Sequence, residues 1–199
     1  KTMKKIIKKL LLKVLNLKIN INELEEILVW QNFYNFEEPF PGFIKKKVLK
    51  NYSSKNVIWV ETGTYEGYTA EFLSNISKFV HTIEPSKKYF DLSKERLSKF
   101  SNCKVYNETS ESILEEILLE IPDGESICLE FELKTIEKFI NKFSNFTILV
   151  DDFRLFDEKY EKKEIYPDKY FLIDWAAENN LDWNVTRDIF VASNSINNP

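Results

Sequence analysis

Hydrophobic residues in this chain fall into two kinds of run, one short and compact and one spaced three or four positions apart. The compact runs, in which a few polar residues stand among the apolar ones, predict strands at residues 57–60, 79–83, 104–107 and 146–150, with one or two further strands between 183 and 193. The spaced runs between them predict helices at about 67–77, 87–99, 110–121 and 170–179. Strands that alternate with helices are typical of a parallel sheet covered on both faces. We therefore expect an α/β fold, a Rossmann-like three-layer sandwich.

The first 17 residues follow the helical spacing and carry five lysines between the apolar positions, at 4, 5, 8, 9 and 13. They predict a basic amphipathic helix. Such a helix binds a membrane surface or a partner protein, or it packs on the domain or on a second subunit with its lysines in solvent. The apolar stripe contains no Trp or Phe, which favours packing, and a homodimer contact through this helix is one form of it.

A second short helix is expected from Asn22, as its N-cap, to Trp30. An aromatic-rich segment follows at residues 30–43, where prolines and a glycine exclude a continuous helix. This segment is a candidate lid over a pocket, although aromatic loops more often simply pack.

The composition restricts the classes of protein to consider. The 199 residues, 43% hydrophobic and 15% aromatic, suit one globular domain and exclude a disordered chain. A net charge of -4 and a pI near 5.3 argue against a nucleic-acid partner. No apolar run approaches the roughly 20 residues of a transmembrane helix, and no signal-peptide pattern is evident, so a cytoplasmic location is expected. Cys103 and Cys128 have no metal-ligand spacing.

Acidic residues end the first two predicted strands. In open parallel sheets ligands bind beyond the carboxyl ends of the strands, and the first such end here is the turn from Glu61 to Gly67. Gly63 lets a ligand approach the backbone, and Gly67 permits close contact with a helix. Tyr65 occupies the middle position, which is glycine in many such loops. Glu84 ends the next strand, 17 residues beyond Gly67, where a carboxylate can accept hydrogen bonds from two ribose hydroxyls.

Three blocks of sequence, at 60–69 (VETGTYEGYT), 81–86 (HTIEPS) and 148–156 (ILVDDFRLF), resemble those of a bacterial family of class I S-adenosylmethionine (SAM)-dependent methyltransferases. The order and spacing are similar over about residues 40–193. The resemblance implies a mostly parallel seven-stranded sheet with an antiparallel last strand. Together with the patterns at the start of the chain, it gives the expected domains: a SAM-binding domain at 46–199, preceded by an N-terminal region of amphipathic helices and an aromatic lid segment at 1–45.

The resemblance also implies which residues bind the cofactor. Gly63 and its neighbours would line the methionine part of SAM, Glu84 would hold the ribose, and residues 109–110 would flank the adenine. Where this chain has Thr109 the family often has Asp. The full expected set is Glu61, Thr62, Gly63, Thr64, Tyr65, Gly67, Thr69, Glu84, Pro85, Ser86, Thr109 and Ser110.

Asp151 and Asp152 follow the strand at 146–150 as an adjacent pair of carboxylates. Such a pair is costly unless a cation or hydrogen-bond donors offset the repulsion. The pair resembles that of metal-dependent sugar O-methyltransferases, which implies a divalent ion such as Mg²⁺ and a catalytic role for both residues. In the alternative, one Asp caps a turn and the other is solvated. Arg154 follows the pair and would either bind an anionic substrate or pair with Asp152; we expect the second.

One departure from the family concerns the central strand that normally precedes the helix before the Asp-Asp strand. Here residues 122–127 run almost directly into 128–133, which read as the start of that helix. Either residues 126–131 form a degenerate strand, or a loop is missing near Ile127 and Cys128. Loss of a central strand would leave a hole in the sheet, so we expect a missing loop.

These observations predict an enzyme that transfers a methyl group from SAM to an oxygen of a small molecule or sugar. A nicotinamide-dependent oxidoreductase on the same architecture is a second interpretation, which Tyr65 in the first turn disfavours. A SAM-binding domain without catalysis is a third.

Overall fold

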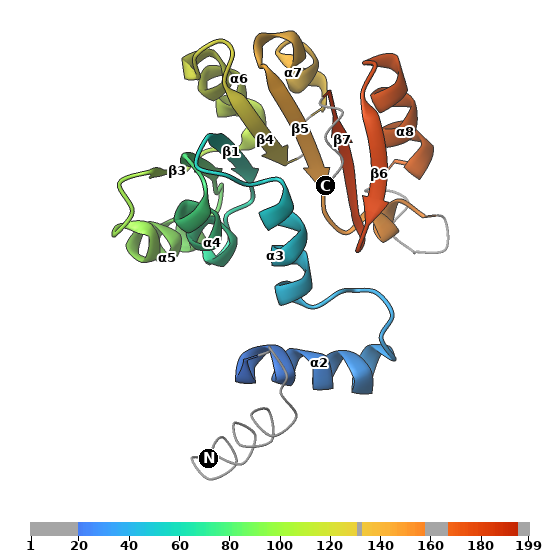
Figure 1. The fold of residues 1–199 in the computed structure, drawn as a ribbon. Coiled ribbons are helices and arrows are strands. Elements are labelled where there is room, and N and C mark those ends of the chain that lie inside the picture. The colour runs from blue at the N-terminus through green and yellow to red at the C-terminus, as the bar shows by residue number, and fades with distance from the viewer. Residues whose placement is uncertain (1–19, 131–132, 158–166, 195–199) are drawn as a thin grey trace. The chain divides into compact units, whose positions relative to one another are not determined.

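The computed structural model describes residues 20–130, 133–157 and 167–194, and the chain divides into two compact units, residues 1–47 and 48–199 (Figure 1). The predicted basic helix at residues 1–17 lies outside the described residues. Within the described residues, no helix is long and apolar enough to cross a membrane.

The smaller unit contains helix α2 (Ile21–Tyr34) and the start of α3 (Gly42–Asn51). The N-cap of α2 is Asn20, not Asn22 as predicted, because Asn20 and Glu23 form a reciprocal capping box. The helix also continues past Trp30 and ends at the left-handed residue Asn35. The break that we expected from the prolines is confirmed, because α3 begins directly after Pro41.

The larger unit is built on a seven-stranded sheet in the order β3-β2-β1-β4-β5-β7-β6. Strand β7 is antiparallel to both of its neighbours, and the other neighbouring pairs are parallel. The predicted mostly parallel sheet with an antiparallel last strand is therefore confirmed. The strands are β1 (Val57–Thr62), β2 (Phe79–Ile83), β3 (Cys103–Tyr106), β4 (Ser126–Glu130), β5 (Asn145–Val150), β6 (Asp182–Thr186) and β7 (Ile189–Ser193).

Helices cover both faces of the sheet, as the sandwich prediction requires (Figure 1). Alternate residues of a strand point to opposite faces: Ile58 and Val60 belong to one buried cluster, and Trp59 belongs to the other. The first cluster includes residues of α6, α7 and α8, and the second includes residues of α3, α4 and α5. The helices are α4 (Tyr68–Ile76), α5 (Lys87–Leu97), α6 (Ser110–Glu120), α7 (Leu133–Glu137) and α8 (Lys169–Glu178), with short 3₁₀ helices η1 (Ile140–Lys142) and η2 (Phe153–Phe156).

The expectation of a missing loop near Ile127 is wrong. Residues 126–130 form the central strand β4, which pairs in continuous register with β1 on one side and β5 on the other. Ile127 and Cys128 are buried, and the helix that we expected to start at residue 128 is α7, which begins at Leu133. The apolar run is short and flanked by acidic residues, so its strand character is weak in the sequence.

Candidate cofactor site

The predicted cofactor residues lie at one edge of the sheet, because β1, β2 and β3 are adjacent and parallel and their carboxyl ends meet there. Glu61 and Thr62 end β1, residues 63–67 form the β1–α4 loop, and Thr69 lies in the first turn of α4. Residues 84–86 connect β2 to α5, and residues 109–110 begin α6 after β3. The Asp151-Asp152 pair follows β5, which is separated from β1 by β4.

The β1–α4 loop has an unusual backbone, with positive φ angles of 92° at Gly63, 51° at Tyr65 and 81° at Gly67. The amides of Gly63 and Thr64 both donate to the carbonyl oxygen of Ile83, at 2.9 and 3.1 Å, which ties the loop to β2. A Cβ at Gly63 would meet nothing within 4 Å, so the backbone is open to a ligand there. A Cβ at Gly67 would lie 3.1 Å from the Cβ of Ser93 on α5, which confirms that this glycine permits close helix contact.

Glu61 is a buried carboxyl group at the end of β1, with only 3% of its surface exposed. The Thr82 hydroxyl donates to it at 2.5 Å, and the Thr64 and Thr82 hydroxyl oxygens are also 2.5 Å apart. The single hydroxyl hydrogen of Thr82 is used in its hydrogen bond to Glu61. Thr64 is therefore the donor in the hydrogen bond between the two threonines. Burial raises the pKa of Glu61 from 4.5 to about 7; the Thr82 hydrogen bond lowers it, and the nearby charge of Glu84 raises it further.

Glu84 is also buried, and backbone amides fix the orientation of its carboxylate. Tyr65 N donates to one oxygen at 2.7 Å and Ser86 N to the other at 2.8 Å. A carboxylate offers about four acceptor positions, so each oxygen keeps one for a further donor. The side-chain amide of Asn107, at the end of β3, donates to the Glu84 carbonyl at 2.9 Å and ties the β2–α5 connection to β3.

Several contributors to this edge escaped the sequence analysis. Thr82 looks like an ordinary residue of an apolar strand, and its register opposite Glu61 reveals its role. Asn107 is the last residue of the predicted strand at 104–107 and directly follows β3 in the structure; a polar residue at a strand end is the signal that could have found it. Tyr65 was in the predicted set, and its part in binding the cofactor stays a prediction; its ring lies against that of Tyr89 on α5, with centroids 4.4 Å apart.

Asp151 and Asp152 form a turn that the protein's own donors stabilise. The Asp152 amide donates to the Asp151 carboxylate at 2.8 Å, and Arg154 Nη1 lies 2.8 Å from the Asp152 carboxylate, which confirms the expected pair. Arg154 also forms an ion pair with Asp188, a buried residue of the β6–β7 turn that the sequence analysis missed. Among the described residues, no group of three or more His, Cys, Asp or Glu side chains is arranged to hold a metal ion.

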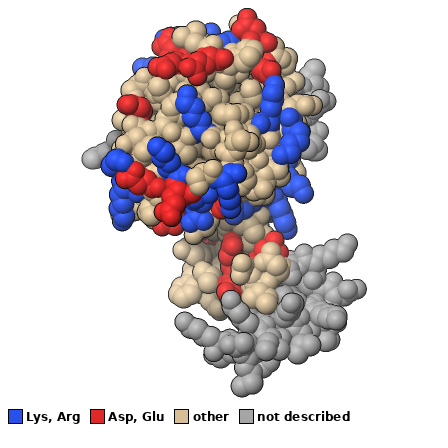
Figure 2. All heavy atoms as spheres, turned by 90° about the vertical axis from the view of Figure 1, so that its left-hand side faces the viewer, with Lys and Arg blue, Asp and Glu red and all other residues tan. Residues whose placement is uncertain are grey.

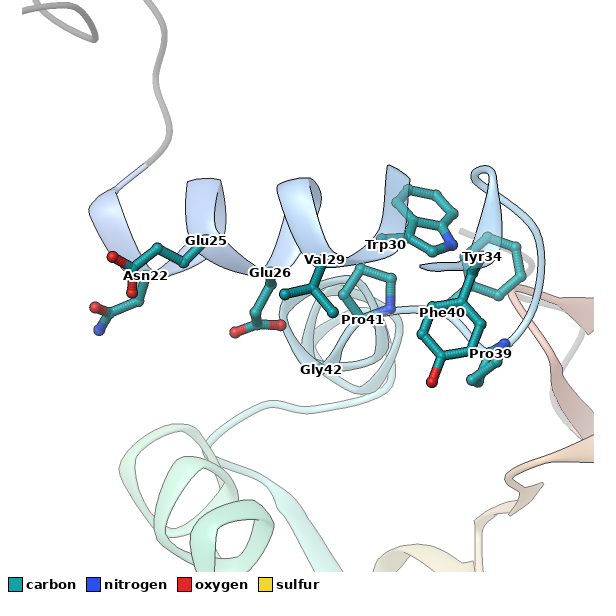
Figure 3. A pocket seen from close by; sticks show the side chains of 10 residues that line it. All are labelled: Asn22, Glu25, Glu26, Val29, Trp30, Tyr34, Pro39, Phe40, Pro41 and Gly42. Atoms are coloured by element: carbon teal, nitrogen blue, oxygen red, sulfur yellow. The ribbon is translucent and has the colours of Figure 1, made fainter. Parts of the chain in front are cut away.

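The smaller unit contains a pocket of about 500 Å³ along one side of α2 (Figure 3). Glu25 and Glu26 lie toward one end, and Trp30, Tyr34 and Phe40 line the other. The Trp30 ring packs against Phe40, with centroids 5.4 Å apart. The aromatic segment that we expected to form a lid thus lines a pocket, while its role as a lid stays a prediction.

Comparison with known proteins identifies the fold. No family model matches the sequence, and no curated protein is similar to it. Solved structures are similar at low sequence identity. One is a SAM-dependent methyltransferase from Aquifex aeolicus, with 18% identity and a TM-score of 0.50 over 74% of this chain and 87% of that one. Another is the fibrillarin of Aeropyrum pernix in complex with SAM, with 13% identity and a TM-score of 0.51 over 75% of this chain and 74% of that one. A third is a precorrin 8W decarboxylase from Methanobacterium thermoautotrophicum, with 14% identity and a TM-score of 0.51 over 78% of this chain and 90% of that one.

Proposed function

We propose that this chain is a methyltransferase that moves a methyl group from SAM to an oxygen of a small molecule or sugar. The single observation that carries the proposal is the pair of buried carboxyl groups, Glu61 and Glu84, beside an open backbone at Gly63. The fold, which is the Rossmann-like fold of the methyltransferases above, supports it.

The chemistry of these groups fits SAM. The cofactor carries an ammonium group, a positively charged sulfur and a ribose diol. Glu61 would interact with the positive charge, and the remaining acceptor positions of Glu84 would take the diol hydrogens. When bound, SAM supplies a methyl group on a sulfonium, which is transferred by direct displacement. Such a step needs alignment more than acid-base catalysis, so the chain's main contribution is positioning.

For the acceptor, we propose that Asp151 orients the attacking hydroxyl group. Its carboxylate is exposed at the same edge of the sheet and is itself held by the Asp152 amide. A divalent ion such as Mg²⁺ bound by Asp151 and Asp152 is the metal-dependent form of this proposal. Methyl transfer measured with added Mg²⁺ and with EDTA distinguishes the two forms.

A small acceptor fits the surface better than a nucleic acid. The net charge is -4, and a nucleic-acid site requires a continuous basic surface. On the face that carries α5, lysine and arginine side chains lie between aspartates and glutamates (Figure 2). A panel of sugars and catechols, with an RNA oligonucleotide as the competing class, is the corresponding assay. Methylation of the RNA alone would contradict this choice.

Binding of the cofactor is tested by calorimetry with SAM and with NAD. We expect SAM to bind and NAD to fail. Glu84→Gln should weaken SAM binding at least tenfold, because the amide group offers one acceptor oxygen in place of two. Glu108→Gln, at an exposed carboxylate on the β3–α6 connection, is the matched control. Binding of NAD instead of SAM would favour the oxidoreductase, whereas SAM binding without methyl transfer to any acceptor would favour the non-catalytic domain.

The pH dependence of SAM binding is a second test. Because the pKa of Glu61 is about 7 in the free protein, binding a cation below pH 7 requires release of a proton. SAM affinity should therefore fall by up to tenfold per pH unit below 7 and level off above it. Glu61→Gln should remove this dependence. Wild-type affinity that is flat from pH 5.5 to 8 would contradict the role of Glu61.

The N-terminal region, residues 1–45, is proposed as a lid or dimer contact for the methyltransferase domain at 46–199. Light scattering of the full chain and of a variant that lacks residues 1–17 tests the dimer. An unchanged number of subunits, after correction for the 17 residues removed, would reject a dimer through that segment.

A further inference from the structure

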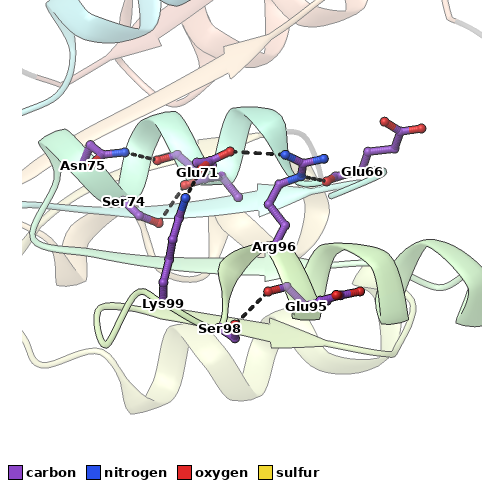
Figure 4. Close-up of polar contacts among 9 residues, drawn as sticks. Glu66, Glu71, Ser74, Asn75, Glu95, Arg96, Ser98 and Lys99 are labelled. Atoms are coloured by element: carbon purple, nitrogen blue, oxygen red, sulfur yellow. Dashed lines mark hydrogen bonds and ion pairs between the residues drawn. The ribbon is translucent and has the colours of Figure 1, made fainter.

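Arg96, near the C-terminal end of α5, joins α5 to the β1–α4 loop (Figure 4). Its Nε donates to the carbonyl oxygen of Glu66 at 2.7 Å, and its Nη1 lies 3.5 Å from a carboxylate oxygen of Glu71 in the first turn of α4. Its guanidinium carbon lies 3.7 Å from the centre of the Tyr68 ring. One side chain therefore contacts the end of the loop and the start of the helix that follows it.

This contact matters because the loop backbone is strained. Gly63 and Gly67 adopt their positive φ angles without cost, but Tyr65 is not a glycine and has a φ of 51°, so the conformation at its position persists only where the surroundings hold it. Hydrogen bonds to Ile83 and Glu84 hold the first three residues of the loop. The Glu66 carbonyl, at the other end, is held by Arg96.

The chemistry of arginine suits this position. The side chain is 31% exposed and borders a polar groove of about 490 Å³ between α4 and α5, so water competes for the carbonyl. Stacking on Tyr68 covers one face of the planar guanidinium and leaves its edge to donate. Lysine has no planar group to stack and donate in this way. Lys99 pairs with the same Glu71, at 2.5 Å, but its bond goes to the helix rather than to the loop.

We propose that Arg96 is a positioning residue, which holds the β1–α4 loop in the conformation that binds the methionine end of SAM. This inference rests on the proposed function. If Arg96 is removed, the loop spends part of its time in other conformations. The apparent affinity for SAM then falls in proportion to the fraction of molecules whose loop is still in the binding conformation.

Hydrogen exchange in the protein without cofactor tests the loop directly. In Arg96→Ala, the amides of residues 63–67 should exchange about tenfold faster, because a hydrogen bond from a charged donor is lost, while amides of β5 keep their rates. Arg96→Lys should not restore slow exchange, since charge alone does not hold the carbonyl. Lys99→Ala should match the wild type. Unchanged loop exchange in Arg96→Ala overturns the proposal, as does an equal increase in β5, which would show general destabilisation.

Calorimetry and kinetics with SAM test the consequence. Arg96→Ala should weaken SAM binding about tenfold, with the loss in KM for SAM rather than in kcat, and Lys99→Ala should not. Faster loop exchange with unchanged SAM affinity overturns the link to the cofactor. Failure of the wild type to bind SAM overturns the proposed function, and the exchange experiment still decides whether Arg96 holds the loop.

Discussion

Replacing Glu61 by glutamine removes a buried charge while it keeps the shape of the side chain and an oxygen for the Thr82 hydroxyl. In the folded protein, burial raises the pKa of Glu61 from 4.5 to about 7. The folded state therefore holds this proton more tightly than the unfolded state does. The stability that Glu61 contributes is fully present below pH 4.5 and is lost as the pH rises through 7.

The size of the effect follows from the two pKa values. Each tenfold change in proton affinity corresponds to about 1.4 kcal/mol. A change from 4.5 to about 7 thus makes the wild type about 3 kcal/mol less stable at pH 8 than at pH 4, as far as this group is concerned. Most of that loss falls between pH 5 and 8. Glutamine does not titrate, so the Glu61→Gln variant does not show this pH-dependent loss of stability.

The assay is urea unfolding of both proteins at pH 5 and pH 8. The difference in unfolding free energy between variant and wild type should change by about 2.5 kcal/mol in favour of the variant from pH 5 to pH 8. Taking this double difference cancels the titration of all other groups and any pH-independent effect of the substitution. Glu115→Gln, at an exposed carboxylate, provides the baseline. A double difference below about 1 kcal/mol would refute the reasoning, because it would mean that Glu61 is ionised in the folded protein at no cost.

Two further substitutions test the packing around the site. Gly67→Ala should lower the unfolding free energy in urea by about 3 kcal/mol, because alanine is strained at a left-handed φ and its Cβ would press against α5. Gly124→Ala, where φ is also positive but the space is open, should cost only about 1 kcal/mol, and equal costs would contradict the role of the contact. Arg154→Leu should cost about 3 kcal/mol because it leaves buried Asp188 without its cation. Lys138→Ala, in an exposed ion pair, should cost less than about 1 kcal/mol, and a similar loss in both would contradict the importance of burial.

The sequence predicts most of this fold because periodicity is a local signal. Strands β1, β2 and β5 are short runs made mostly of apolar residues, and their ends differ from the predicted ends by two residues or fewer. For the central strand β4, the sequence analysis considered a degenerate strand at residues 126–131 and rejected it in favour of a missing loop. The local signal is weak because β1 and β5, the strands that pair with β4, lie far away in the chain. Helix α2 was mispositioned for a local reason. Both Asn20 and Asn22 are good caps, and the reciprocal bond with Glu23 favours Asn20.

For the candidate site, the sequence predicts which strand ends carry the polar groups, because parallel strands bring their carboxyl ends to one edge. Apart from the local pair of Arg154 and Asp152, it does not predict which groups contact each other. Thr82 reaches Glu61 across the β1–β2 register, and Arg96 reaches Glu66 from a helix 30 residues away. Such contacts depend on how strands and helices are placed relative to one another, which no local pattern contains.

The acid pair at the end of β5 shows how a distant residue changes the interpretation of a local motif. In the sequence, the repulsion between Asp151 and Asp152 calls for a cation, and a metal ion is one way to supply it. In the structure, Arg154 supplies a positive charge to Asp152, and the Asp152 amide donates to Asp151. The carboxylate of Asp188, in the β6–β7 turn, in turn holds Arg154: it accepts from the guanidinium and from the backbone amide of Arg154. The protein's own donors therefore offset the repulsion between the adjacent carboxylates, and a metal requirement has to be argued from the chemistry of the acceptor rather than from the pair itself.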